Sequence, residues 1–109
     1  MDEKRQLKRI DFNRAVSYQL TDQSLCVGSV GCDISESGIR LHVNDFVALG
    51  KKLLLNIQLQ PGKLVECCAQ VVWVTKDSFS DKYQIGLEFA ATDSIYNAQK
   101  KIHDFASQE

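Results

Sequence analysis

The amino-acid sequence predicts an all-β domain: a six-stranded antiparallel β-barrel followed by one C-terminal helix. From residue 16 to residue 89, apolar and polar residues alternate in short segments, with the two-residue period of half-buried strands. The segments are joined by short polar connections, and after residue 89 the apolar spacing becomes helical. Six antiparallel strands in a chain of 109 residues favour a barrel, because closure removes exposed sheet edges.

Residues 1–11 show neither period and are dense in charge. Residues 1–14 carry five basic and three acidic side chains, whereas the rest of the chain carries 8 basic and 11 acidic ones. We therefore predict one domain over residues 1–109, with a flexible basic arm at 1–11 and an acidic barrel at 12–90. The overall charge of -1 argues against a DNA-binding or RNA-binding surface.

Six segments are predicted to form strands, and a seventh to form a helix. The strands are expected at 16–20, 30–34, 39–43, 53–59, 65–74 and 83–89. In the second of them, Val30, Cys32 and Ile34 alternate with polar residues and should share one face. Pro61 and Gly62 suit a type II turn between the fourth and fifth strands. The helix is expected at 92–106, capped by Thr92 or Asp93, with an apolar face of Ile95, Ala98, Ile102 and Phe105.

Cysteine and histidine placement gives no support for a metal site or for catalysis. The four cysteines, at 26, 32, 67 and 68, form no CxxC pair and lie in apolar segments, so we expect buried, reduced thiols. Neither His42 nor His103 has a partner pattern for metal binding or nucleophilic catalysis. We therefore expect no metal, no cofactor and no enzyme activity. The chain has no apolar run of about 18 residues, and we expect a cytoplasmic protein without a membrane span.

The sequence contains two short polar motifs, one before the first predicted strand and one between the second and the third. Arg5 and Arg9 form an RxxxR pattern in the basic arm, and residues 33–38 form a DxSxxG pattern in a predicted turn. Each motif alone is common, because arginines four apart usually lie in solvated segments and Asp, Ser and Gly are typical of turns.

Their combination and placement resemble the PilZ domain family. The resemblance extends over nearly the whole chain and is supported by the run at 38–41, the strands at 71–73 and 85–89, and the terminal helix. It implies a six-stranded barrel that binds the second messenger cyclic di-GMP. The family's binding residues map onto Arg5, Arg9, Asp33, Ser35 and Gly38 without a substitution.

The chemistry of these residue types agrees with that implied ligand. Arginine can pair with phosphate and with the guanine edge, and the carboxylate of Asp33 can accept guanine N–H groups. The hydroxyl of Ser35 can bond to phosphate or base, and Gly38 would let the backbone approach the ligand.

Three further residues each have two possible roles. Lys4 either helps to neutralise a second ligand molecule or is solvated, and Arg40 faces either the same site or the solvent. Trp73 is either a core or rim side chain or a stacking surface for guanine.

The resemblance also suggests how the domain would signal. The expected mechanism is that the arm folds over the barrel when ligand bridges Arg5 and Arg9 to Asp33 and Ser35, and that an unidentified effector protein detects the change. The main alternative is a PilZ-like protein-interaction module that binds no nucleotide, and a barrel for single-stranded nucleic acid is a weaker one. Monomer and homodimer both remain open.

Overall fold

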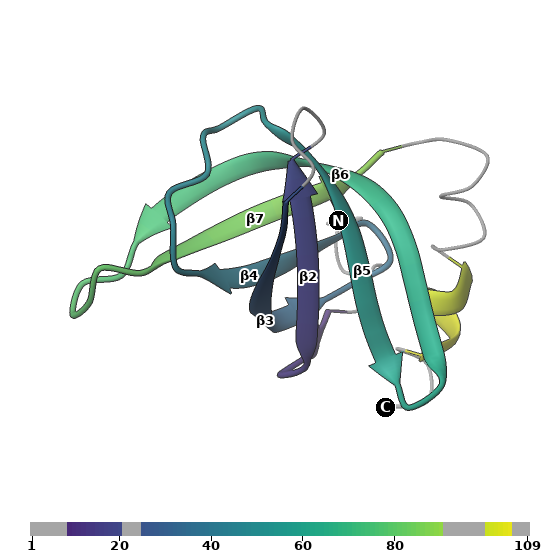
Figure 1. Ribbon diagram of the computed structural model, residues 1–109. Coiled ribbons are helices and arrows are strands. Elements are labelled where there is room, and N and C mark those ends of the chain that lie inside the picture. The colour runs from purple at the N-terminus through teal and green to yellow at the C-terminus, as the bar shows by residue number, and fades with distance from the viewer. Residues whose placement is uncertain (1–8, 21–24, 91–99, 106–109) are drawn as a thin grey trace, which may run out of the picture.

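The computed structural model describes residues 9–20, 25–90 and 100–105, and its strands form one curved sheet (Figure 1). The strands are β1 (Ile10–Asp11), β2 (Ala15–Leu20), β3 (Cys26–Ile34), β4 (Gly38–Val43), β5 (Lys52–Gln60), β6 (Lys63–Lys76) and β7 (Tyr83–Phe89).

All strand pairings are antiparallel, and the sheet closes on itself. The strand order is β1-β3-β2-β5-β6-β7-β4, and β4 also pairs with β3. Six strands, β2 to β7, therefore complete a ring, while β1 adds to the end of β3. The predicted six-stranded antiparallel barrel is confirmed.

The barrel is filled by the inward-facing residues of its strands. In β5, and in β6 from Val65 to Val71, every second residue is buried, as the alternating sequence predicts. The core includes Tyr18, Leu41, Leu55, Ile57 and Ile85, all at most 3% exposed. At the turn between β5 and β6, Gly62 has a φ of 82°, which agrees with the predicted type II turn.

Two β-bulges change which face consecutive residues occupy. The first interrupts the pairing of β3 with β4 between Gly31 and Asp33. Val30 is consequently 50% exposed and Cys32 half-buried, whereas Ile34 is in the core. The prediction that these three residues share one face was wrong, because an extra residue in one strand reverses the alternation beyond it. The second bulge lies between Val71 and Trp73 in β6.

The cysteines do not share one environment. All four are free of disulfide bonds, but only Cys67 is buried, and Cys32 is half-buried. Cys26 and Cys68 are exposed, which corrects the expectation of four buried thiols. Both lie on the outward face of their strands, where alternation places every second residue.

The two ends of the described chain meet beside the barrel. Ile10 and Asp11, placed in the flexible arm by the sequence analysis, instead pair with the end of β3 as strand β1. Phe12 is buried next to them and packs edge-on against Phe105, with 5.8 Å between ring centroids.

The C-terminal helix is described at residues 100–105, where Ile102 and Phe105 are buried as predicted. Its predicted beginning, with Thr92, Asp93, Ile95 and Ala98, lies outside the described residues, as does most of the predicted arm. Within the described ranges, no helix is long and apolar enough to cross a membrane.

Candidate functional site

Four residues from four strands form a row across the outer wall of the barrel. Asp33 of β3 is the register partner of Arg40 of β4, and Arg40 is also the partner of Gly86 of β7. Gly86 is in turn the partner of Trp73 of β6. Neighbours directly opposite in a sheet point to the same face. The row therefore places a carboxylate, a guanidinium and an indole on one surface.

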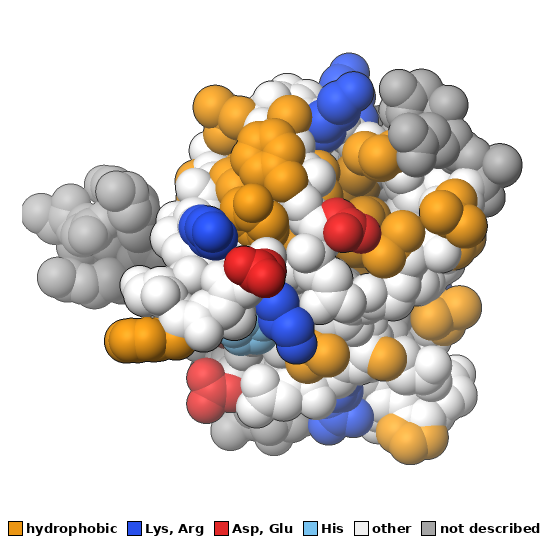
Figure 2. Space-filling model, turned by 60° about the vertical axis from the view of Figure 1, so that its left-hand side comes forward, with side chains coloured by type: hydrophobic (Ala, Val, Ile, Leu, Met, Phe, Trp, Pro, Cys, Tyr) orange, Lys and Arg blue, Asp and Glu red, His pale blue; other side chains and the backbone are white. Residues whose placement is uncertain are grey.

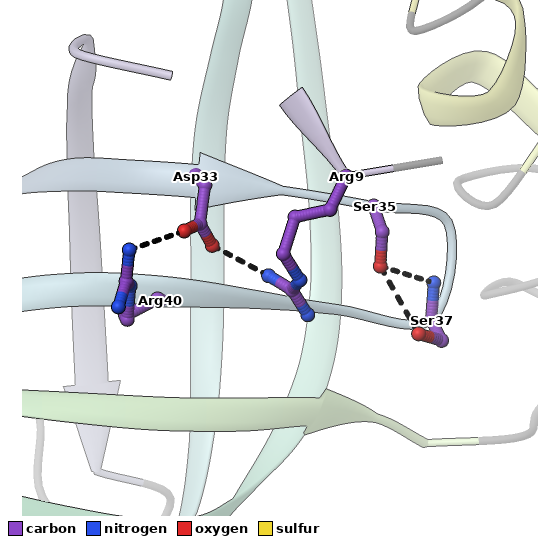
Figure 3. Close-up of polar contacts among 5 residues, drawn as sticks. All are labelled: Arg9, Asp33, Ser35, Ser37 and Arg40. Carbon is purple, nitrogen blue, oxygen red and sulfur yellow. Dashed lines mark hydrogen bonds and ion pairs between the residues drawn. The ribbon is translucent and has the colours of Figure 1, made fainter. Parts of the chain in front are cut away.

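Asp33 is held between two arginines (Figure 3). Arg9 donates from Nη1 to Oδ1 of Asp33 at 2.6 Å, and Arg40 donates from Nη2 to Oδ2 at 2.5 Å. Asp33 is only 8% exposed, whereas the side chains of Arg9 and Arg40 are 46% and 42% exposed. Two guanidiniums facing one carboxylate leave a net positive charge at the surface, which favours an anion.

At the other end of the row, Trp73 lies across the backbone of Gly86. A Cβ added to Gly86 would collide with Nε1 and the neighbouring carbons of the indole. Glycine at residue 86 thus leaves the space that the indole fills. The bulge before Trp73 brings both Val72 and Trp73 to the outer face, because it adds one residue to β6.

The row borders a cavity of about 220 Å³, lined by Arg9, Asp33, Ile39, Arg40, Val72, Trp73, Gly86 and Leu87. Hydrophobic side chains also gather into a patch beside basic and acidic ones on the face drawn in Figure 2. The cavity combines a flat apolar surface, two guanidiniums and one carboxylate. This is the chemistry needed to bind an aromatic base that carries phosphate.

The DxSxxG motif forms the tight connection between β3 and β4. The N–H of Ser35 donates to the carbonyl of Gly38 at 2.9 Å. The Ser35 hydroxyl is 1% exposed, lies 3.0 Å from the Ser37 hydroxyl and accepts a bond from the Ser37 N–H at 3.3 Å. In Figure 3 it points toward Ser37 rather than toward Asp33. Ser35 thus stabilises the turn from inside.

Residue 38 must be glycine because a neighbouring strand packs closely against it. A Cβ at residue 38 would collide with the carbonyl oxygen of Leu87 in β7. The sequence analysis expected Gly38 to make room for a ligand, but the atom that approaches it belongs to the neighbouring strand. Close pairing of β4 with β7 explains glycine at this position.

The structure therefore brings some of the predicted site residues together and separates others. Arg9, Asp33, Arg40 and Trp73 line one cavity, while Ser35 and Gly38 lie in the adjoining turn. Arg5 and Lys4 lie outside the described residues. The sequence analysis missed Gly86 and Val72 as parts of the site. A glycine inside an alternating strand was the available signal, because it often marks close approach by another group.

One more contact ties the motif turn to the C-terminal helix. Glu36, inside the DxSxxG motif, lies with Oε2 2.6 Å from Nδ1 of His103. His103 lies on the exposed side of the helix. In the described parts of the chain, no group of His, Cys, Asp and Glu side chains could hold a metal ion.

The sequence profile of the PilZ domain matches residues 3–107. The chain belongs to the PilZ domain family. The match includes both motifs and all seven strands, so the resemblance noted from the motifs is confirmed over nearly the full length of this PilZ domain. No curated protein matches the chain.

Several solved structures share the fold of this PilZ domain. The inhibitor of motility MotI/DgrA from Bacillus subtilis is 23% identical, with a TM-score of 0.76 over 94% of this chain and 49% of its own. The PilZ domain of YcgR from Escherichia coli, solved with c-di-GMP, is 13% identical, with a TM-score of 0.67 over 96% of this chain and 93% of its own.

The MrkH–c-di-GMP complex from K. pneumonia is 15% identical, with a TM-score of 0.74 over 94% of this chain and 50% of its own. This PilZ domain thus spans about half the length of MotI and MrkH. At these identities the similarity establishes the fold.

Proposed function

We propose that this PilZ domain is a receptor for cyclic di-GMP, which it binds on the outer wall of the barrel without chemical change. The observation that carries the proposal is the row from Asp33 through Arg40 and Gly86 to Trp73, with Arg9 above it. It joins a carboxylate, two guanidiniums and an indole, which complement a ligand made of two guanines and two phosphates. The structures of YcgR and MrkH with c-di-GMP support this choice of ligand.

In the proposed complex, the two motif arginines bind the phosphates and guanine edges. Arg9 leaves Asp33 for the ligand, and Arg5 reaches further across it. Asp33 then accepts N–H donors of a guanine, while Trp73 offers a stacking surface at the opposite end of the cavity. Ser35 and Gly38 belong to the proposed site through the turn that they build.

The proposed output is a change in the arm that carries Arg5 and Arg9. Ligand binding brings Arg5 to the barrel wall, where Arg9 exchanges its contact with Asp33 for one with the ligand, and an effector protein detects the new surface. The Bacillus relative is an inhibitor of motility, which supports an adaptor that acts through a partner. The proposed partners are cyclic di-GMP and one effector protein in the cytoplasm, with no nucleic acid, metal or further cofactor.

Both Arg5 and Arg9 are needed to reach a micromolar affinity for cyclic di-GMP. Micromolar binding corresponds to about 8 kcal/mol, each bidentate guanine contact supplies roughly 1–3 kcal/mol, and ordering a segment costs about 2–5 kcal/mol. Removing either arginine would therefore take away much of the net binding free energy.

We predict that Arg5→Ala and Arg9→Ala each weaken binding of cyclic di-GMP at least about tenfold, because each removes one such contact. Titration calorimetry measures the affinity and the stoichiometry. Thermal unfolding of the free protein should be nearly unchanged, because Arg40 still pairs with Asp33 in Arg9→Ala. Lys52→Ala, which removes an exposed cation from β5, is the matched control. Affinity close to wild type in both arginine variants would contradict the proposed site.

The same titration decides between the receptor and its main alternative. A wild-type protein that gives no heat and no amide shifts with cyclic di-GMP would be a protein-interaction module on the same barrel. Chromatography of the ligand after incubation tests the absence of chemistry, and recovery of a hydrolysed dinucleotide would contradict it.

A further inference from the structure

We infer that Arg40 is a positioning residue, which keeps the Asp33 carboxylate in a fixed orientation when Arg9 turns to the ligand, and so sets the preference for guanine. The inference rests on the proposed function and assigns a role within the same site. Arg40 then acts on the ligand through Asp33 rather than by leaving Asp33 for a phosphate.

The two arginines that bind Asp33 are anchored differently. Arg40 lies in the middle of β4, with backbone pairing to β3 on one side and to β7 on the other. Its Nε is buried and has no hydrogen-bond partner within the described residues. Arg9 precedes β1, a strand of two residues that stands at one end of the strand order and pairs with β3. Arg40 is therefore the fixed partner of Asp33, and Arg9 is the movable one.

Charge pairing explains why Asp33 needs two partners. Leaving a carboxylate that is 8% exposed without a cation beside it is costly, because a buried charge needs a partner. The ionisable side chains that line the cavity are Arg9, Asp33 and Arg40. If Arg9 moves to a phosphate, Arg40 is the cation that remains in contact with Asp33. The second arginine thus makes the movement of the first one possible.

The geometry also explains a preference for guanine. Arg40 binds Oδ2, so the departure of Arg9 frees Oδ1, and guanine offers adjacent N–H donors to a carboxylate. Adenine presents an acceptor beside its amino group at the corresponding edge, which a carboxylate cannot satisfy. A carboxylate in a fixed orientation therefore distinguishes the two bases. Without Arg40, nothing would hold that orientation once Arg9 has moved.

The first test measures discrimination between two ligands by titration calorimetry. Arg40→Met, Arg40→Lys and the control Lys52→Met are titrated with cyclic di-GMP and with cyclic di-AMP. We expect Arg40→Met to reduce the ratio of the two affinities by about tenfold, the size of one good base contact, and Arg40→Lys to recover part of it. An unchanged ratio in Arg40→Met, with or without a loss of overall affinity, would overturn the inference.

The second test needs no ligand, so it separates this inference from the proposed function. Two double-mutant cycles, Arg40→Met with Asp33→Asn and Arg9→Met with Asp33→Asn, are measured by denaturant unfolding. We expect the larger coupling for the pair of Arg40 and Asp33. Equal or smaller coupling would show that Arg40 does not hold Asp33 more firmly than Arg9 does, and would overturn the inference. A wild type that binds no cyclic di-GMP would refute the receptor and the guanine preference, while the cycles would still decide which arginine fixes Asp33.

Discussion

At the residue scale, the site depends on how single side chains are surrounded. Asp33 lies on a barrel wall, yet it is nearly buried because Arg9 and Arg40 cover it from two directions. Burial raises the pKa of the adjacent Cys32 thiol, and the nearby Arg40 partly opposes that shift. Asp33 adds to the rise in the pKa of Cys32, so residues of β3 and β4 both act on this thiol.

Two glycines of β3 and β4 provide a matched pair of substitutions. We predict that Gly38→Ala lowers the free energy of unfolding by about 1–3 kcal/mol, because its Cβ would collide with the Leu87 carbonyl. Gly28→Ala is the control, since no atom lies within 4 Å of the added Cβ. Urea unfolding measures both variants. Equal stability of the two would show that β7 can move away from residue 38 without cost.

Trp73 is the single tryptophan of the chain, so its fluorescence reports on the cavity. We predict that cyclic di-GMP shifts or quenches its emission, because a base stacked on the indole changes its exposure. Gly86→Ala should change the emission of the free protein and weaken ligand binding about tenfold, since its Cβ would displace the indole. An emission spectrum that does not respond to saturating ligand would remove Trp73 from the site.

At the element scale, two bulges determine which side chains lie on the outer face of the barrel, and side-chain contacts hold the C-terminal helix against it. The bulge in β6 brings Val72 and Trp73 to the outer face, and the bulge in β3 places Asp33 opposite Arg40. The helix contacts the barrel beside the motif turn, through Glu36 with His103 and through Phe12 with Phe105. The two helix contacts join segments that are distant in sequence.

We predict that Phe105→Ala lowers the free energy of unfolding by about 3–5 kcal/mol, because a buried aromatic ring is lost. In a double-mutant cycle with Phe12→Ala, the edge-on ring pair should contribute a coupling of about 0.5–1.5 kcal/mol. Denaturant unfolding measures both quantities. A loss below about 1 kcal/mol would show that the helix contributes little to the stability of the barrel.

At the scale of the whole molecule, closure of the barrel separates two classes of thiol. Cys67 points into the core, where burial, with smaller effects from Cys68 and Glu66, raises the pKa of its thiol to about 12. Cys26 and Cys68 are exposed. A thiol inside a closed sheet reaches reagent only when the barrel opens.

We predict that an alkylating reagent at pH 8 modifies Cys26 and Cys68 rapidly, and Cys67 only at the rate of barrel opening. The pH dependence follows from the raised pKa of Cys67. Above pH 9.0 the Cys67 thiol ionises in the unfolded chain but keeps its proton in the folded protein. The contribution of this thiol to the free energy of unfolding is therefore fully present below pH 9.0 and is lost as the pH rises toward about 12. Mass spectrometry of a labelling time course and unfolding at alkaline pH measure these effects. Rapid labelling of Cys67 in the native protein would contradict the closed core.

The sequence by itself determined the class of the fold, the approximate strand positions and the two motifs. Alternation along β5, β6 and β7 is a local property, as is the type II turn at Gly62, and local patterns are visible without coordinates. Arg9 and Asp33 were found in the same way, because their motifs are short and contiguous.

Only the tertiary structure decided which residues share a surface. The row of Asp33, Arg40, Gly86 and Trp73 spans more than fifty residues of sequence and depends on strand register and on two bulges. Register is set by the packing of all strands around one core, and a shift of one residue turns every side chain to the other face. For that reason the alternating pattern predicted the wrong face for Val30. Neighbouring residues also did not indicate that Arg40 pairs with Asp33, or that residue 38 must be glycine because the Leu87 carbonyl lies against it.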